Sequence, residues 1–185
     1  MTEMTGASSY RRFLQGDMTA LEDLMRTYSD PLIRFAYCYV KDSVEAEDIM
    51  EDAFAALILR RKAFSDCENF RAYLYKIVRN KSLDHLRRKK RKVPLSDLEN
   101  LLCDGGDTER EAAKNERNQR LYRCMQQLPT QYEEALYLMY FEDYRPAEIS
   151  KIIKKTEKQT YNILARAKAA LKELLKKEGI FYEDL

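Results

Sequence analysis

The chain has 185 residues, of which 45% are hydrophobic and 35% charged, with only 5 glycines and 4 prolines. This composition favours helices and allows two small domains. No apolar run approaches the roughly 18 residues of a membrane span, and the short polar N-terminus lacks the apolar stretch of a secretory signal. Four dispersed cysteines and one histidine argue against a disulfide framework or a structural zinc site, so reduced thiols in the cytoplasm are expected.

The net charge of +2 hides alternating acidic and basic blocks. Residues 17–54 hold ten acids and three bases, whereas 70–92 hold ten bases and one acid. Residues 93–118 are again acidic, with seven acids and three bases, and 145–177 carry ten bases and three acids. A protein that binds only a polyanion has little use for the acidic blocks, so they call for another explanation.

Helical spacing predicts four helices in the N-terminal half, after a tail of residues 1–16. The first would span about 17–29, and Pro31 suits the first turn of the second. A third helix would begin at Asp42, because Glu45 three residues later completes the pattern of a capping box. The apolar positions of this helix predict its buried face: Ala46, Ile49, Met50, Ala53, Phe54 and Leu57.

A fourth helix is expected over about 70–90, after a short polar loop. Asn69 suits the position that caps this helix, and Leu74, Ile77 and Leu86 suit its buried side.

Residues 93–115 are the best candidate for a linker, because they combine Pro94, the pair Gly105-Gly106 and an acidic excess. Beyond them the spacing predicts helices over about 116–127, 130–141, 146–153 and 157–177. The apolar stripe of the last helix is Thr160, Ile163, Leu164, Ala167, Leu171 and Leu174. No segment alternates convincingly at the period of a strand, so the sequence predicts an all-α protein of two small domains joined by a flexible linker.

The segment from Arg145 to Ile153, followed by a basic helix, has the pattern of a helix-turn-helix. Small Ser150 would let the second helix approach, and Thr156 would cap that helix. Lys154 stands where such turns favour glycine, because a left-handed conformation costs a larger residue about 1 kcal/mol. The residues presented to a major groove would be Thr156, Lys158, Gln159, Tyr161, Asn162 and Arg166. A helical hairpin of a bundle would give a similar pattern.

The third helix carries two like-charge pairs at i,i+4 spacing, Glu47 with Glu51 and Asp48 with Asp52. Each pair weakens the helix by a few tenths of a kcal/mol, roughly. Two interpretations remain open. The acids form either an ordinary solvated face or a docking surface for a basic protein partner, toward which complementary charge would steer them.

The fourth helix mixes aromatic rings with cations and ends in six consecutive bases, residues 87–92. Cations can follow a phosphate backbone, aromatic faces can stack unpaired bases, and an asparagine amide can bind the edge of an extruded base. The candidate DNA-binding residues are Phe70, Arg71, Tyr75, Lys76, Arg79, Asn80, Arg87 and Arg88. Tyr73 is expected to lie inside. The alternative is a core aromatic set beside a solvated charge run, although six consecutive bases repel one another without a polyanion.

Together these segments resemble the extracytoplasmic-function (ECF) group of bacterial sigma factors. Residues 46–54, Ala-Glu-Asp-Ile-Met-Glu-Asp-Ala-Phe, are similar to the family's region 2 helix, usually AEDIxQExF. Residues 70–88 are similar to its stretch (F)xxWLxxIaxN…D…R, and Leu128-Pro129 with the helix-turn-helix looks like region 4. The resemblance covers nearly all residues from about 17 to 177, with Glu51 in place of the usual Gln and Tyr73 in place of the usual Trp.

The resemblance implies that residues 17–92 form region 2, residues 93–115 an acidic linker, and residues 116–180 region 4. Region 2 would bind the coiled coil of the largest RNA polymerase subunits through Glu47, Asp48, Glu51 and Asp52. Its fourth helix would bind the −10 element as single strand, with Phe64 and Asn69 in the loop that helps hold a flipped base. Region 4 would bind −35 duplex and the polymerase flap. An anti-sigma partner, often membrane-bound in this family, is also implied.

The expected function is therefore to direct the polymerase core to promoters and to help open them. No nucleophile–base pair, metal cluster or phosphate-binding glycine loop is visible, so no catalytic residue, metal, cofactor or small-molecule substrate is expected. The main alternative is a stand-alone helix-turn-helix regulator that binds duplex DNA as a dimer, which leaves the acidic helix unexplained. A polymerase-binding adaptor that never contacts DNA leaves both basic segments unexplained.

Overall fold

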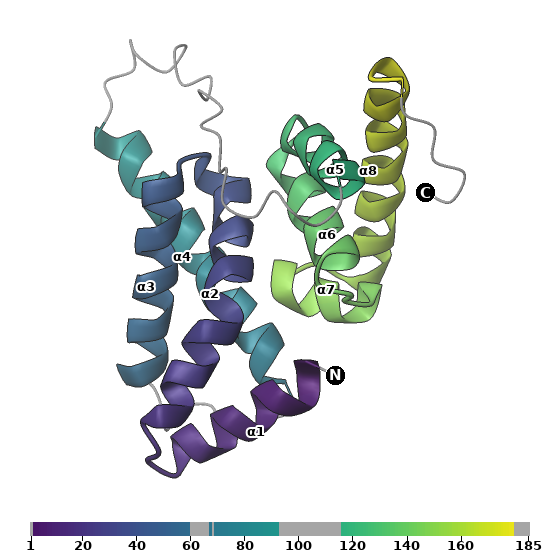
Figure 1. Cartoon of the computed structure of the whole chain (residues 1–185). Coiled ribbons are helices and arrows are strands. Elements are labelled where there is room, and N and C mark those ends of the chain that lie inside the picture. Colours follow the sequence, from purple (N-terminus) through teal and green to yellow (C-terminus); the bar gives the residue numbers. More distant parts are fainter. Residues whose placement is uncertain (1, 60–66, 68, 93–115, 180–185) are drawn as a thin grey trace. The chain divides into compact units, whose positions relative to one another are not determined.

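The computed structural model describes residues 2–59, 67, 69–92 and 116–179 (Figure 1). The chain divides into two compact units, Met1–Gly106 and Asp107–Leu185. Every regular element in the described ranges is a helix, which confirms the predicted fold class. None of these helices is long and apolar enough to cross a membrane. The predicted linker, residues 93–115, lies outside the described residues.

The first unit contains four helices: α1 (Thr2–Leu14), α2 (Thr19–Val40), α3 (Ser43–Leu59) and α4 (Phe70–Lys92). α2 contacts each of the other three helices, so it lies at the centre of the unit (Figure 1). α3 and α4 also contact each other, and α1 packs on α2 and α4. The unit therefore has one shared core, which α2 organises.

The expected N-terminal tail is wrong, because most of residues 1–16 form the helix α1. The rings of Tyr10 and Phe13 are fully buried, and Tyr10 contacts the ring of Phe70 at the start of α4. Gly6 lets this helix approach α2, since a Cβ at Gly6 would collide with the hydroxyl of Tyr28. Two aromatic residues three positions apart lie on the same side of a helix and are enough to anchor this otherwise polar segment.

The turn between α1 and α2 is held by Asp17. Its Oδ1 accepts hydrogen bonds from the amide of Thr19 at 3.0 Å and from the hydroxyl of Thr19 at 2.7 Å. Its Oδ2 pairs with the guanidinium of Arg12 at 2.6 Å. The hydrogen bonds from Thr19, followed by the one from Arg12, lower the pKa of Asp17 to about 2.

The expected break at Pro31 is also wrong, because α2 continues through it from Thr19 to Val40. A proline inside a helix removes one backbone hydrogen bond and costs roughly 3 kcal/mol. The helix continues because Leu24 and Tyr28 before the proline and Leu32 and Phe35 after it form one buried stripe. The free energy gained by burying these four large side chains exceeds the cost of one proline inside the helix.

The expected core face of α3 is confirmed, since all six of its predicted residues are buried. Asp42 caps the helix, because its Oδ1 accepts a hydrogen bond from the amide of Glu45 at 2.9 Å. The buried side of α4 differs from the prediction. Leu74 is buried as expected, but Ile77 and Leu86 are half-buried. The fully buried side chains of α4 are Phe70, Leu74, Tyr75, Val78 and Ser82.

The second unit contains α5 (Glu116–Gln126), α6 (Thr130–Tyr140), α7 (Pro146–Ile153) and α8 (Glu157–Lys177). These bounds lie within one residue of the predicted ones. α8 contacts α5, α6 and α7 and closes the core. Its buried stripe follows the prediction as far as Leu171, after which Leu175 is buried and Leu174 half-buried.

Candidate functional site

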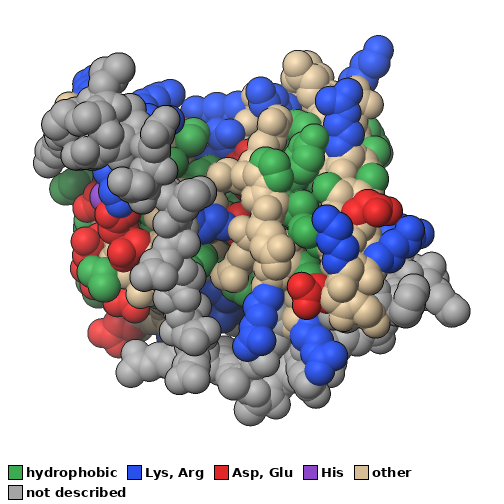
Figure 2. Space-filling model, turned by 90° about the horizontal axis from the view of Figure 1, so that it is seen from above, with side chains coloured by type: hydrophobic (Ala, Val, Ile, Leu, Met, Phe, Trp, Pro, Cys, Tyr) green, Lys and Arg blue, Asp and Glu red, His purple; other side chains and the backbone are tan. Residues whose placement is uncertain are grey.

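The exposed residues of α3 lie on one side of the helix, opposite its buried stripe. They share the spacing of a single helical face and are Val44, Glu47, Asp48, Glu51, Asp52, Ala55, Ile58 and Leu59. The four predicted docking acids occupy its centre, and we call them the acidic face. Figure 2 shows acidic side chains gathered at the left of the molecule, where α3 lies in Figure 1. Apolar side chains flank the acids, with Leu59 86% exposed.

Two ion pairs and a contact with a histidine join α3 to α4. Lys81 Nζ lies 3.1 Å from Asp52 Oδ2, so one member of the acidic face already has a cation beside it. Lys89 Nζ lies 2.8 Å from Oε1 of Glu45, and Nε2 of His85 lies 3.2 Å from Oε2 of the same carboxylate. α4 therefore contacts α3 through polar side chains at two places along its length, at Lys81 and at His85 with Lys89.

The solvent side of α4 carries several of the predicted −10 residues. Lys76 and Arg87 are exposed, and Asn80 between them is half-buried on the same helical face. Asn69 is exposed at the start of the helix, and its carbonyl accepts a hydrogen bond from the amide of Tyr73 at 3.0 Å. Of the remaining predicted residues, Arg71 and Arg79 are half-buried and Arg88 is exposed.

Two predicted DNA-stacking rings are core residues instead. Phe70 is 1% exposed and Tyr75 is fully buried, with the Tyr75 ring centroid 5.1 Å from that of Phe35. Tyr73, expected inside, is half-buried and lies on the helical face of Lys76. The predicted positions of Tyr73 and Tyr75 are therefore wrong, because the packing of α2 determines which side of α4 is buried. Phe64 lies outside the described residues.

The second unit contains the predicted helix-turn-helix, with α7 and α8 joined by a tight turn. Lys154 adopts the left-handed conformation expected at that position, with φ 56° and ψ 50°. The amide of Lys155 then donates to the carbonyl of Ser150 at 3.0 Å. Thr156 caps α8, since its hydroxyl oxygen accepts a hydrogen bond from the amide of Gln159 at 3.2 Å.

All six residues predicted to bind −35 DNA are exposed. Lys158, Tyr161, Asn162 and Arg166 share one face of α8, at the spacing that one side of a helix presents to a groove. Gln159 is partly committed within the protein, because its Oε1 accepts a hydrogen bond from the amide of Thr156 at 3.0 Å. Only its amide nitrogen remains available as a donor to DNA.

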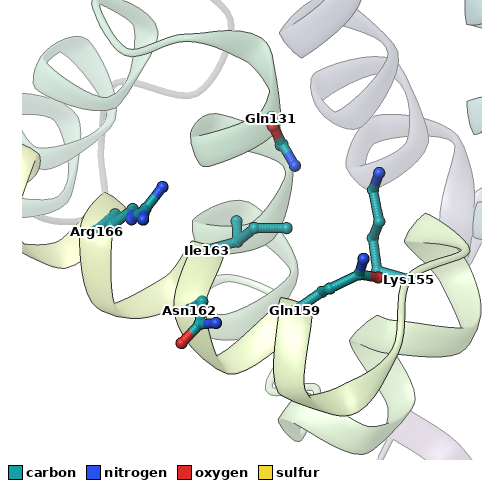
Figure 3. Close-up of a pocket in the computed structure, with 6 residues that line it drawn as sticks. All are labelled: Gln131, Lys155, Gln159, Asn162, Ile163 and Arg166. Carbon is teal, nitrogen blue, oxygen red and sulfur yellow. The ribbon is translucent and has the colours of Figure 1, made fainter.

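A shallow pocket of about 210 Å³ lies beside this face (Figure 3). It is lined by Gln131, Lys155, Gln159, Asn162, Ile163 and Arg166. Gln131 comes from the first turn of α6 and was not predicted, because nothing in the local sequence shows that this turn lies beside α8. Amide and cationic groups from three segments therefore surround one opening, a set suited to phosphate and base edges.

The sequence matches two family models. Sigma-70 region 2 matches residues 10–92, and Sigma-70, region 4 matches residues 118–171. Among curated relatives, the chain is 28% identical over 155 residues to the ECF RNA polymerase sigma factor SigM of Bacillus subtilis, covering 83% of this chain and 94% of SigM. It is 23% identical over 184 residues to SigW of the same organism, covering 94% and 98%.

Two solved structures share the fold. One is the sigma factor RpoE in complex with the anti-sigma factor NepR from Bartonella quintana, with a TM-score of 0.72, 20% identity and coverage of 84% of this chain and 96% of that one. The other is CnrH in complex with the cytosolic domain of CnrY, with a TM-score of 0.66, 20% identity and coverage of 94% and 98%.

Proposed function

The chain belongs to the ECF group of the sigma-70 family, and we propose that its two units divide the steps of promoter recognition between them. As a sigma factor it directs the RNA polymerase core to promoters in transcription initiation. Its relatives are sigma factors, a class that is not catalytic itself. A stand-alone regulator is not favoured, because a helix-turn-helix regulator alone does not account for the match to region 2.

The acidic face of α3 docks on the coiled coil of the largest polymerase subunits. This assignment is supported by the exposure of Glu47, Asp48, Glu51 and Asp52 on one side of the helix. An exposed row of like charges gains from a basic partner, which would also speed the encounter. Because Asp52 has Lys81 beside it, we expect Glu47 and Asp48 to contribute more to docking.

The solvent side of α4 holds the −10 element as unpaired strand. Lys76, Arg87 and Arg88 follow the phosphates, and the amide of Asn80 binds an extruded base. Asn69 and Arg79 extend the same surface, whereas Arg71 lies farther around the helix and would contact a phosphate from the side. Tyr73 takes the stacking role first given to Tyr75, because its ring is not fully covered. Stacking of about 1–3 kcal/mol per base is comparable with the cost of unstacking it.

The exposed face of α8 binds −35 duplex in the major groove. Asn162 suits an adenine edge, whereas Lys158 and Arg166 suit guanine or phosphate. Thr156 contributes chiefly as the cap that presents the first turn of α8. Lys155 and Gln131, at the edge of the pocket, add contacts to the phosphate backbone of the DNA. Docking of both units on one polymerase raises the effective concentration of each at the promoter.

An anti-sigma factor is a further proposed partner, by analogy with RpoE, which forms such a complex. Bacterial transcription takes place in the cytoplasm, so that is the proposed location of the active protein. A membrane-bound anti-sigma factor would hold the idle protein at the inner face of the membrane.

Promoter selection followed by transcription tests the proposal. Random duplex DNA is selected with the complex of this chain and bacterial core polymerase, and the recovered sequences are used as templates for run-off transcription. Initiation that requires both the chain and a recovered sequence is expected. Asn80→Ala should impair opening, measured by permanganate reactivity of unpaired thymines, more than binding to closed duplex. If the chain and core neither associate nor initiate from any recovered DNA, the proposed function is wrong.

A further inference from the structure

Glu45 lies at the start of α3, outside the acidic face, and its side chain turns toward α4. Lys89 Nζ donates to its Oε1 at 2.8 Å, and Nε2 of His85 lies 3.2 Å from its Oε2. Oε2 is shielded from solvent and accepts no hydrogen bond among the described residues, so the nearby His85 imidazole is its polar neighbour. One carboxylate thus holds two residues that are one turn apart on α4.

This contact lies at the C-terminal end of α4, where the helix no longer packs in the core of the first unit. Ser82 is the last fully buried side chain that the structure describes in this helix, since those of residues 83–91 are half-buried or exposed. Figure 1 shows the C-terminal turns of α4 beside the start of α3. Leu83 and Leu86 are only half-buried, and among the described residues the polar contacts that join this end to α3 are those of Glu45 with Lys89 and His85.

The held side of α4 lies opposite the face that carries Lys76, Asn80 and Arg87, three of its proposed DNA-binding residues. Lys81, His85 and Lys89 follow one another at spacings of four and face α3. Asn80 and Arg87 lie on the other side of the same helix. A helix held along one side presents the opposite side in a fixed direction.

We propose that Glu45 is a positioning residue, which orients the basic C-terminal half of α4 for promoter DNA by holding Lys89 and His85. This inference rests on the proposed function, because it deepens the role given to α4. Asp42 supports the arrangement, since its cap on the Glu45 amide fixes the backbone from which the carboxylate extends.

The direction in which one substitution changes the affinity for DNA distinguishes this positioning role from a simple effect of charge. Glu45→Gln removes a negative charge beside a DNA-binding helix and releases Lys89, so charge alone predicts tighter DNA binding. Positioning predicts weaker DNA binding, by about two- to five-fold for the loss of one partly exposed ion pair. It also predicts a shallower dependence of affinity on salt, because misplaced cations displace fewer counterions.

The experiment uses the complex of the full chain with core polymerase and a fluorescein-labelled fork of the promoter recovered by selection. Affinity is measured over a range of salt for wild type, Glu45→Gln and the exchange Glu45→Lys with Lys89→Glu. Glu22→Gln, at an exposed site on α2, is the control for loss of one acid. Glu45→Gln should weaken fork binding without changing affinity for core, and the exchange should restore most of the loss. Fork binding by Glu45→Gln that equals or exceeds that of wild type overturns the proposal.

Hydrogen exchange of the free full chain provides a second, independent readout. Amides 83–91 should exchange faster in Glu45→Gln, while those of 74–78 in the core remain as in wild type. Unchanged exchange at 83–91 also overturns the proposal. If no promoter is recovered with wild type, the proposed function fails, whereas exchange at these amides still decides whether Glu45 holds α4.

Discussion

The ring of Tyr10 stacks on the ring of Phe70, with centroids 4.0 Å apart and planes inclined by 17°. Tyr28 contacts the same Phe70 ring edge-on, at 5.9 Å. The first helix of the chain and the centre of α2 thus meet at the first residue of α4. Since Asn69 and Tyr73 adjoin this cluster, α1 supports the end of α4 where the proposed single-strand contacts begin.

Tyr10→Ala should destabilise the first unit by about 3–5 kcal/mol, the usual cost of removing a buried aromatic ring. Tyr10→Phe keeps the stack and should cost much less. Urea unfolding followed by circular dichroism measures both. Tyr161→Ala is the matched control, because that ring is 58% exposed in the second unit, and its effect should stay within about 0.5 kcal/mol. Equal effects at the two tyrosines would contradict the anchoring role of α1.

Alkaline pH should destabilise the first unit through the same residue. Burial, followed by the nearby groups of Tyr73 and Cys67, raises the pKa of Tyr10 from 10.0 to about 12. The folded state therefore favours the neutral phenol. Its contribution to stability is complete below pH 10, the pKa in the unfolded chain, and is lost as pH rises from 10 to 12. Over that interval the unfolding free energy of wild type should fall relative to that of Tyr10→Phe, and parallel curves would show that the pKa of Tyr10 is the same in the folded and unfolded chain.

Charge reversal tests the docking surface. Glu47→Lys combined with Asp48→Lys should weaken binding to core polymerase by at least about ten-fold, or roughly 1.4 kcal/mol, because cations would then face the basic partner. The binding is measured by competition with a labelled wild-type chain. Glu22→Lys with Asp30→Lys makes the same change of charge at exposed positions of α2 and should have little effect. A similar loss in both double variants would point to net charge rather than to a surface on α3.

Lys154→Gly should stabilise the helix-turn-helix by about 0.5–1 kcal/mol, because glycine adopts a positive φ without a Cβ clash. Lys154 has φ 56°. Lys155→Gly is the control, since Lys155 is not among the described residues with positive φ and should only lose stability through a more flexible unfolded chain. Thermal unfolding of the full chain measures both. A lower midpoint for Lys154→Gly would indicate that the lysine side chain makes a stabilising contact larger than its backbone strain.

Local sequence determined the elements whose cause lies within one turn of helix. The six-residue core stripe of α3, the start of α7 at Pro146 and the cap of α8 at Thr156 all depend on spacing or on a cap close by in the chain. The exposed position of the acidic face followed from the same spacing, because the side of a helix opposite an apolar stripe faces solvent.

Tertiary structure alone decided the features that depend on residues far apart in the chain. α1 became a helix with a buried side because Phe70 and Tyr28 cover Tyr10, and α2 passed through Pro31 because its buried stripe continues. Polar and apolar residues are mixed around α4, so its periodicity does not choose between Tyr73 and Tyr75, and Phe35 makes that choice by packing on Tyr75. The contact of Glu45 with Lys89 joins residues 44 positions apart. Caps and helical spacing act over about four residues, whereas burial and ion pairing depend on which helices the fold brings side by side.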